Sequence, residues 1–270
     1  MPVLYVIFLK YFIKKALFND LTDNNLLSDV QFGFCSGRSC TTQLLNTLDI
    51  WMSDLDNNIS TDAIYLDFSK AFDTVPHLRL INKLKGYGIT GNILNWIIDF
   101  LSNRTQYVKL NESESTHLPV TSGVPQGSVL GPILFIYYIN DLPCCTQTNM
   151  RIFADDTKVF STINNIDDQT KLQLAIDSLY EWTQKWLLKF NESKCKVMHI
   201  GLNNPQFSYT IGPNNSKTLI ETTTTEKDIG VYMDPLLKFS LHVTEIIKKA
   251  NIVKYLIIKN NTYKTKCVVC

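Results

Sequence analysis

The chain has 270 residues, of which 45% are hydrophobic, and a formal net charge of +1. This length fits one large domain or two small ones, and the hydrophobic content excludes a chain that is disordered throughout. The charge excludes an overall basic field, so a nucleic-acid partner would have to bind locally clustered Lys and Arg. One such cluster lies near the C-terminus, although a solvated helix face explains it equally well: Lys248, Lys249, Lys254, Lys259, Lys264 and Lys266.

The seven cysteines are odd in number and irregularly spaced, which does not suggest a disulfide framework. This favours a reducing, intracellular location, nuclear or cytoplasmic, and no targeting signal is seen. Cys267 and Cys270 have zinc-ligand spacing, but a structural zinc site needs four ligands and no second pair is present. The apolar run at 2–9 is too short to span a bilayer, so we expect no membrane partner and an amphipathic helix that ends near Asn19.

The first half of the chain shows a strand pattern followed by two helix patterns. Residues 63–68 predict a buried strand. Pro76 opens a helix that ends at Gly86 or Gly88, and Thr90 is placed to cap a second helix. The apolar stripe expected on that second helix comprises Ile93, Trp96, Ile97 and Phe100.

Short elements separated by turns fill the second half. In chain order they are a polar hairpin (111–116), a Gly- and Pro-containing loop (122–127), an apolar helix (128–140), a hairpin (152–160), a helix (172–186), two strands (195–200 and 229–233) and a basic helix (239–258). This order of strands and helices predicts an α+β fold with a largely antiparallel sheet.

Acidic side chains occur where the expected strands end. Asp155 and Asp156 form the tip of a predicted hairpin, and Asp67 lies at the end of the strand at 63–68. If they converge, they can hold two magnesium ions about 3.5–4 Å apart, as two-metal nucleotidyl transfer requires. Asp pairs are also ordinary turn residues, so the surrounding motifs must decide between the two interpretations.

Seven segments, in this order and spacing, carry a family resemblance: 27–34 (LSDVQFGF), 65–73 (YLDFSKAFD), 122–132 (SGVPQGSVLGP), 153–157 (FADDT), 186–191 (WLLKFN), 194–196 (KCK) and 228–231 (DIGV). Together they resemble the reverse transcriptases of non-LTR (LINE-type) retrotransposons, in particular CR1- and Jockey-like elements. The resemblance covers nearly the whole chain.

The resemblance implies a right-hand polymerase core, in which an antiparallel palm sheet packs on helices, with partial fingers and a truncated thumb. The fingers would occupy residues 1–62. The palm would occupy 63–235, with a fingers-side insertion at about 77–121, and the thumb would begin at 236–270. An endonuclease function is expected from a segment outside this chain.

The same resemblance assigns catalysis to Asp67, Asp155 and Asp156, as ligands of two Mg²⁺ ions for which Mn²⁺ can substitute. Asp67 and Asp155 are expected to bind metal directly, whereas Asp156 would orient the site or contact metal only transiently. One ion would activate the primer 3′-hydroxyl and the other would stabilise the departing pyrophosphate.

Three residues match the positions that bind the incoming deoxynucleotide in the family. Phe72 would exclude a 2′-hydroxyl, although a core Phe is the alternative. Gln126 would contact the nucleotide and the template, although a turn at the start of a helix also explains it. Gly127 would allow close approach of the backbone to the ligand.

Basic residues complete the expected site. Lys194 matches a candidate general acid for pyrophosphate, with Lys196 as its competitor and an uninvolved surface lysine as the alternative. Arg38 matches a cation that faces the triphosphate, for which the planar guanidinium is suited. Cys35 departs from the family, which generally has Arg there, so one phosphate-binding cation is expected to be missing.

The function implied by the resemblance is RNA-directed DNA polymerisation, in which deoxynucleotides extend a DNA primer on an RNA template. Template binding would depend on backbone charge and duplex shape. Two alternatives remain. One is a catalytically impaired relic that at most binds nucleic acid, which Cys35 favours. The other is a group II intron maturase, which the CR1-like sequence of residues 189–198 disfavours.

Overall fold

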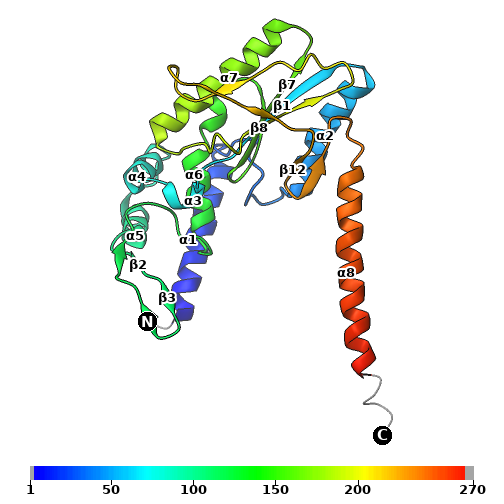
Figure 1. The fold of residues 1–270 in the computed structure, drawn as a ribbon. Helices are drawn as coiled ribbons and strands as arrows, with labels where there is room; N and C mark the ends of the chain where they lie inside the picture. The colour runs from blue at the N-terminus through cyan, green and yellow to red at the C-terminus, as the bar shows by residue number, and fades with distance from the viewer. Residues whose placement is uncertain (1–2, 265–270) are drawn as a thin grey trace.

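A five-stranded sheet forms the centre of the computed structural model, which describes residues 3–264 and the side chains of residues 8–260 (Figure 1). Its strands, in spatial order, are β11 (Glu221–Thr222), β8 (Lys196–Ile200), β1 (Ser60–Leu66), β7 (Asp156–Ile163) and β6 (Asn149–Phe153). β1 pairs antiparallel with both β7 and β8, and β6 pairs antiparallel with β7, whereas β11 runs parallel to β8. The predicted α+β fold with a largely antiparallel sheet is confirmed.

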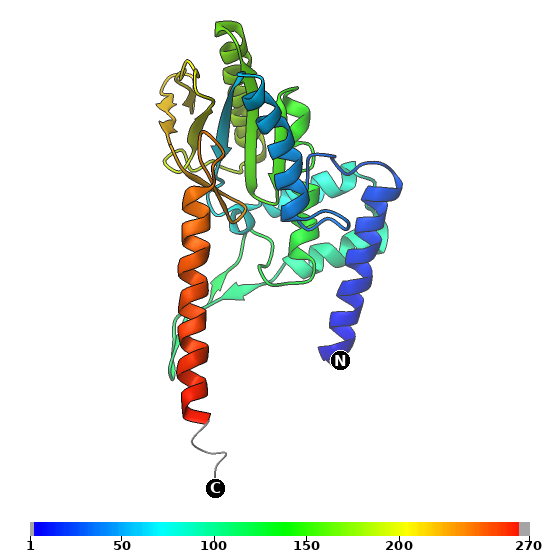
Figure 2. The same cartoon turned by 90° about the vertical axis from the view of Figure 1, so that its right-hand side faces the viewer.

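Different helices cover the two faces of the sheet, because successive side chains of β1 point to opposite faces. Ile64 and Leu66 belong to the larger core, which includes nearly all of α6 (Gly131–Ile139) and the buried side of α7 (Ile166–Trp186). Ala63 packs on the other face against Trp51 of α2 (Cys40–Asp56). Figure 2 shows α2 lying beside the strands.

Helices below one end of the sheet form a second region of the molecule: α1 (Val3–Asp23), α3 (Ala71–Thr74), α4 (His77–Gly86) and α5 (Gly91–Leu101). The predicted polar hairpin extends from this region as β2 (Thr105–Gln106), β3 (Lys109–Leu110), β4 (Ser113–Glu114) and β5 (Leu118–Pro119). The basic helix α8 (Ser240–Lys264) extends away from the sheet in both views (Figures 1 and 2).

The remaining elements are short and lie around the sheet: η1 (Leu142–Cys145), β9 (Thr210–Ile211), β10 (Thr218–Leu219), β12 (Glu226–Asp228) and β13 (Val231–Met233). β12 and β13 form an antiparallel hairpin where a strand at 229–233 was predicted.

No described helix is both long and apolar enough to cross a bilayer. Cys267, Cys270 and Lys266 lie outside the described residues, and the predicted domain boundaries stay a prediction.

Several predicted helix details are wrong. α1 continues to Asp23, four residues beyond Asn19. In the predicted stripe of α5, Ile97 is buried and Trp96 and Phe100 pack partly buried against the core, but Ile93 is 42% exposed. Leu94 and Leu101 are buried in addition, because the contact face is rotated slightly from the expected stripe. Thr90 does stand at the N-cap position of α5, but its side chain makes no capping hydrogen bond.

The apolar helix α6 begins at Gly131, three residues later than predicted. The Ser128 hydroxyl donates to the Pro125 carbonyl at 2.7 Å and accepts from the Gly131 N–H at 2.9 Å. This local turn competes with helix formation over 128–130. The loop at 122–127 is therefore extended by one further turn before the helix starts.

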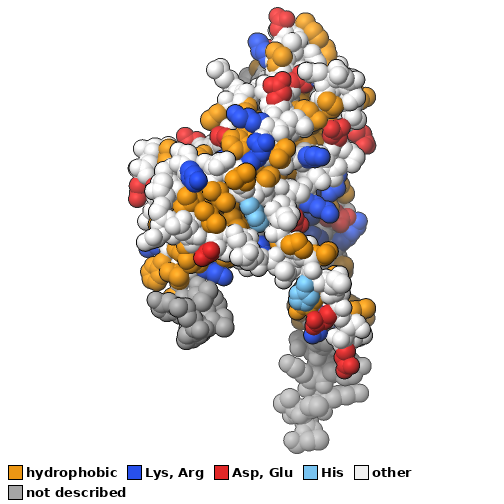
Figure 3. All heavy atoms as spheres, turned by 90° about the vertical axis from the view of Figure 1, so that its left-hand side faces the viewer, with side chains coloured by type: hydrophobic (Ala, Val, Ile, Leu, Met, Phe, Trp, Pro, Cys, Tyr) orange, Lys and Arg blue, Asp and Glu red, His pale blue; other side chains and the backbone are white. Residues whose placement is uncertain are grey.

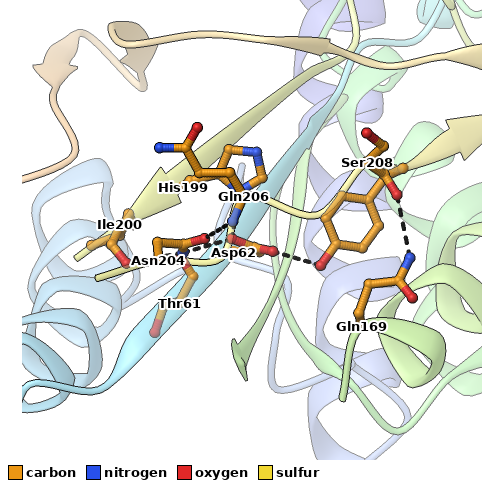
Figure 4. A network of polar contacts seen from close by, with 9 residues as sticks. Thr61, Asp62, Gln169, His199, Ile200, Asn204, Gln206 and Ser208 are labelled. Carbon is orange, nitrogen blue, oxygen red and sulfur yellow. Dashed lines mark hydrogen bonds and ion pairs between the residues drawn. The ribbon is translucent and has the colours of Figure 1, made fainter. Parts of the chain in front are cut away.

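A buried carboxylate occupies the first part of β1, away from Asp67. Asp62 is fully buried and lies 2.7 Å from Nδ1 of His199, and it accepts hydrogen bonds from the Tyr209 hydroxyl (2.6 Å) and the Asn204 amide (2.8 Å) (Figure 4). These partners satisfy the buried charge with polar contacts, as a structural carboxylate requires.

Candidate active site

Strand pairing brings the three candidate aspartates to one end of the sheet. Asp67 directly follows β1, and Asp155 and Asp156 lie at the turn between β6 and β7. In the antiparallel register of β1 and β7, Leu66 lies opposite Thr157. Because Asp67 and Asp156 adjoin these paired residues, they line the same cleft, of about 390 Å³.

Backbone contacts fix both segments that carry the aspartates. The Asn191 N–H donates to the Asp67 carbonyl at 2.7 Å, and the adjacent Phe68 ring stacks on Phe190 with centroids 4.6 Å apart. In the hairpin, Ala154 adopts a left-handed conformation (φ +58°), which a non-glycine residue seldom adopts. This conformation turns the chain sharply, so that Phe153 pairs with Asp156 across the turn.

The aspartates stand in a field of excess negative charge. Burial raises the pKa of Asp156 to about 6, and repulsion from Asp155, Asp228 and Asp67 adds to the effect. Burial likewise raises the pKa of Asp155, with a further contribution from Asp67. Such shifts occur where carboxylates share a site without enough positive charge, and a bound cation would reverse them.

The donor set matches a divalent cation in chemistry. Carboxylate oxygens are the ligands that Mg²⁺ prefers. As the side chains lie, however, no group of three or more His, Cys, Asp and Glu within the described residues is placed to hold a metal ion. The three aspartates therefore share one region and one electrostatic field but do not form a closed coordination shell.

The structure distinguishes the two candidate general acids by their partners. Nζ of Lys194 lies 3.7 Å from Oδ2 of Asp67, in an ion pair with both side chains well exposed. Nζ of Lys196 lies 2.5 Å from the Glu221 carboxylate, across the edge of the sheet. Lys194 is thus the lysine that contacts the aspartate region, although both line the cleft.

A second pocket, of about 500 Å³, collects the predicted nucleotide-binding residues. Phe72, Gln126 and Gly127 line it together with Asp155 and Phe34. The Phe72 ring stacks on Phe135 of α6 with centroids 4.3 Å apart and meets the edge of Phe34 at 6.3 Å. Phe72 is therefore both a core contact and part of the pocket wall.

The loop that carries Gln126 is tied to the segment that carries Phe72. The Val124 N–H donates to the Phe72 carbonyl at 2.7 Å, and the Gln126 amide donates to Oδ1 of Asp73 at 3.1 Å. Gly127 has φ +73°, a conformation that favours glycine. The two motifs therefore form one unit beside Asp155.

Arg38 faces the backbone of its own segment. Its guanidinium donates to the carbonyls of Ser28 (2.8 Å), Asp29 (3.2 Å) and Gln31 (2.5 Å) and pairs with the Asp29 carboxylate at 3.3 Å. Its predicted contact with a triphosphate stays a prediction. Cys35 is buried, and burial raises the pKa of its thiol to about 11, so this side chain supplies no charge.

Sequence reasoning missed a buried ion pair behind the aspartates. Lys158, two residues after Asp156, pairs with Asp228 of β12, and both side chains are at most 5% exposed. The Tyr65 hydroxyl lies nearby and has no hydrogen-bond partner among the described residues. Its burial, together with Asp228 and Glu226, raises its pKa well above the usual value. The signal available was a lysine between Thr157 and Val159, within a segment whose pattern predicts a strand.

Surface charge adds little to the definition of the site. Figure 3 shows one face of the molecule, on which Lys and Arg side chains are mixed with hydrophobic and acidic ones. This mixture agrees with the net charge of +1. The acidic strand ends and the pocket beside them therefore define the site more sharply than any basic field.

An antiparallel sheet with aspartates at one hairpin turn and at the end of the neighbouring strand defines a polymerase-type palm. The fold comparison agrees: apo telomerase from Candida tropicalis, truncated from its C-terminal domain, superposes with a TM-score of 0.54 at 15% identity, covering 84% of this chain and 44% of that one. Residues 9–260 match the model of the reverse transcriptase (RNA-dependent DNA polymerase) family, and the chain belongs to this family. Members of this family generally use a divalent metal.

Similar curated proteins confirm the predicted resemblance to non-LTR retrotransposon enzymes. The chain is 28% identical over 252 residues to the probable RNA-directed DNA polymerase from transposon BS of Drosophila melanogaster, covering 86% of this chain and 26% of that protein. It is 30% identical over 225 residues to the RNA-directed DNA polymerase from mobile element jockey of the same organism, covering 80% and 24%. The chain thus spans about a quarter of the length of these relatives.

Proposed function

We propose that this chain is the polymerising part of a non-LTR retrotransposon reverse transcriptase, which extends a DNA primer with deoxynucleotides on an RNA template. The observation that carries the proposal is the meeting of Asp67, Asp155 and Asp156 at one end of the sheet, where the pocket of Phe72 opens onto Asp155. Family membership supports the reaction type.

In this proposal Asp67 and Asp155 would hold two Mg²⁺ ions, and Asp156 would orient the site; the ions would supply positive charge that favours the 3′-alkoxide and the leaving pyrophosphate. The primer 3′-hydroxyl gives its proton to water, its oxygen attacks the α-phosphorus of the nucleotide, and the bond between the α-phosphorus and the bridging oxygen breaks. Lys194, beside Asp67, donates a proton to the departing pyrophosphate.

Phe72, Gln126 and Gly127 would bind the deoxynucleotide in the pocket next to Asp155. The Phe72 ring is held by Phe135, so it cannot easily move aside for a 2′-hydroxyl. Arg38 would reach the triphosphate only after leaving its carbonyl partners. The nick that primes synthesis at a target would come from an endonuclease segment outside this chain.

A catalytically impaired relic is the second candidate, because Cys35 is a buried neutral thiol where the family carries Arg. Primer extension on an RNA template separates the two functions, with wild type compared with Asp155→Asn. Asp99→Asn, on the exposed side of α5, is the matched control. Extension by wild type and the control, with loss in Asp155→Asn, supports the polymerase; no extension by wild type contradicts it and favours the relic.

A further inference from the structure

Residues 30–33 lie along the outer edge of the hairpin formed by β6 and β7. The Phe32 N–H donates to the Ile152 carbonyl at 2.7 Å, and the Ile152 N–H donates to the Val30 carbonyl at 2.9 Å. These bonds form a parallel bridge between Gln31 and Ile152 on the outer side of β6. The hairpin that ends in Asp155 is therefore held from a segment more than a hundred residues away in sequence.

Gln31 extends this contact to the turn itself. Its side chain is buried, with 1% of the residue exposed, and its Oε1 accepts from the N–H of Gly33 at 2.9 Å and from the N–H of Ala154 at 3.2 Å. Because both partners are donors, the oxygen and not the nitrogen of the amide must face them. Nε2 has no hydrogen-bond partner in the described residues, so the acceptor is the part of the side chain that is used.

The two segments approach each other closely at the same point. A Cβ placed on Gly33 would lie 2.3 Å from the Ala154 nitrogen, closer than any side chain tolerates. Ala154 is the left-handed residue of the turn and directly precedes Asp155. Gln31 and Gly33 therefore fix the backbone from which the Asp155 side chain extends.

The same segment also forms the nucleotide pocket. Phe34 follows Gly33, lines the pocket with Asp155 and meets the edge of Phe72. The pocket wall at Phe34 and the turn that presents the aspartates are therefore both in contact with one short segment, through Gln31 and Gly33.

We propose that Gln31 is a positioning residue for Asp155: its amide oxygen holds the Ala154 N–H and so sets the place of the carboxylate for metal and nucleotide. This inference rests on the proposed function, since the purpose of that placement is polymerisation. Gln31 itself does not touch substrate. The hydrogen bond to Ala154 is its means of action.

Gln31→Met tests the proposal, because methionine fills a similar volume but offers no comparable acceptor. Amide hydrogen exchange of the peptide covering residues 150–157 is measured first. We expect exchange at Ala154 to rise about tenfold, the effect of losing one hydrogen bond. Gln31→Glu keeps an acceptor for both N–H groups and should retain protection at Ala154.

The magnesium concentration for half-maximal primer extension is the second readout, which a merely structural role would not shift. It should rise several-fold in Gln31→Met. The control is Gln173→Met. Gln173 lies on α7, and its side-chain oxygen also accepts a backbone hydrogen bond, from the Thr210 N–H at 2.9 Å. The magnesium requirement of Gln173→Met should stay at the wild-type value, even if its melting temperature falls as much as that of Gln31→Met.

Unchanged exchange at Ala154 in Gln31→Met would overturn the inference. So would an unchanged magnesium requirement in an active enzyme, or an equal shift in Gln173→Met. If wild type does not extend primers, the proposed function fails, and exchange at Ala154 alone then decides whether Gln31 holds the turn.

Discussion

Carboxylates lie near both ends of β1, in two different environments. Asp62, near the start of the strand, is fully buried and is matched by His199, Tyr209 and Asn204. Past the other end, Asp67 stands near Asp155 and Asp156, and the latter two have raised pKa values.

Under the proposed function, the difference separates a structural carboxylate, Asp62, from the carboxylates that would bind metal. Lys158, a buried cation two residues after Asp156, is already paired with Asp228. Lys194 reaches Asp67 only through an exposed contact at 3.7 Å, and such pairs stabilise little. Acidic groups left short of positive charge are expected where a ligand completes the balance.

The largest effect on stability is expected from Asp62→Ala. Three polar partners would lose their common acceptor in a buried place, so the free energy of unfolding should fall by about 3–5 kcal/mol. Urea denaturation measures this change. Asp99→Ala, at an exposed position of α5, should stay within about 0.5 kcal/mol of wild type. A loss for Asp62→Ala no greater than for Asp99→Ala would remove the contrast between the two groups.

Lys194→Leu should slow single-turnover incorporation about a hundredfold, because the departing pyrophosphate would lose its proton donor. Rapid-quench measurement at saturating nucleotide isolates this step. Lys196→Leu is the matched control, since its ammonium group is occupied by Glu221 at the sheet edge. Equal rates for the two variants would remove Lys194 from the mechanism.

Phe72→Val should lower discrimination against ribonucleotides about tenfold, because a smaller side chain opens the pocket wall to a 2′-hydroxyl. The ratio of kcat/KM for a deoxynucleotide and its ribonucleotide measures the effect. Phe100→Val on α5, where Phe100 stacks on Trp96 with centroids 5.7 Å apart, supplies a control of the same size. An unchanged ratio in Phe72→Val would show that Phe72 is only a core residue.

The smallest effect concerns pH. The ordinary pKa of an Asp is 3.8, and that of Asp156 is raised to about 6. Ionising Asp156 is therefore harder in the folded chain, so its contribution to stability is lost as pH rises from about 4 to 6. Asp156→Asn should gain in melting temperature relative to wild type across that range. A difference between the two proteins that does not change with pH would contradict the raised pKa.

Sequence alone predicted the parts of the site that depend on local pattern. The strand before Asp67, the turn at Asp155 and the loop around Gln126 each follow from a few adjacent residues. The comparison with known families then supplied the fold, which local patterns could only describe as α+β.

Contacts between distant segments were beyond such reasoning. The partners Lys158 and Asp228 lie 70 positions apart, and each resembles an ordinary surface charge in the sequence. Arg38 is visible as a cation, but nothing in the sequence indicates that it faces the carbonyl of Gln31. Helix α2 was not predicted, although Ser39 and Thr42 form a capping box at its start.

Binding of Mn²⁺, followed by electron paramagnetic resonance, tests most directly whether the two carboxylate groups differ in kind. Wild type, Asp155→Asn and Asp62→Asn are titrated in the same buffer. We expect wild type and Asp62→Asn to bind Mn²⁺ with the same affinity. Asp155→Asn should bind Mn²⁺ at least about tenfold more weakly, since it lacks one negatively charged ligand. Equal binding by all three proteins would contradict a shared metal site at Asp67, Asp155 and Asp156.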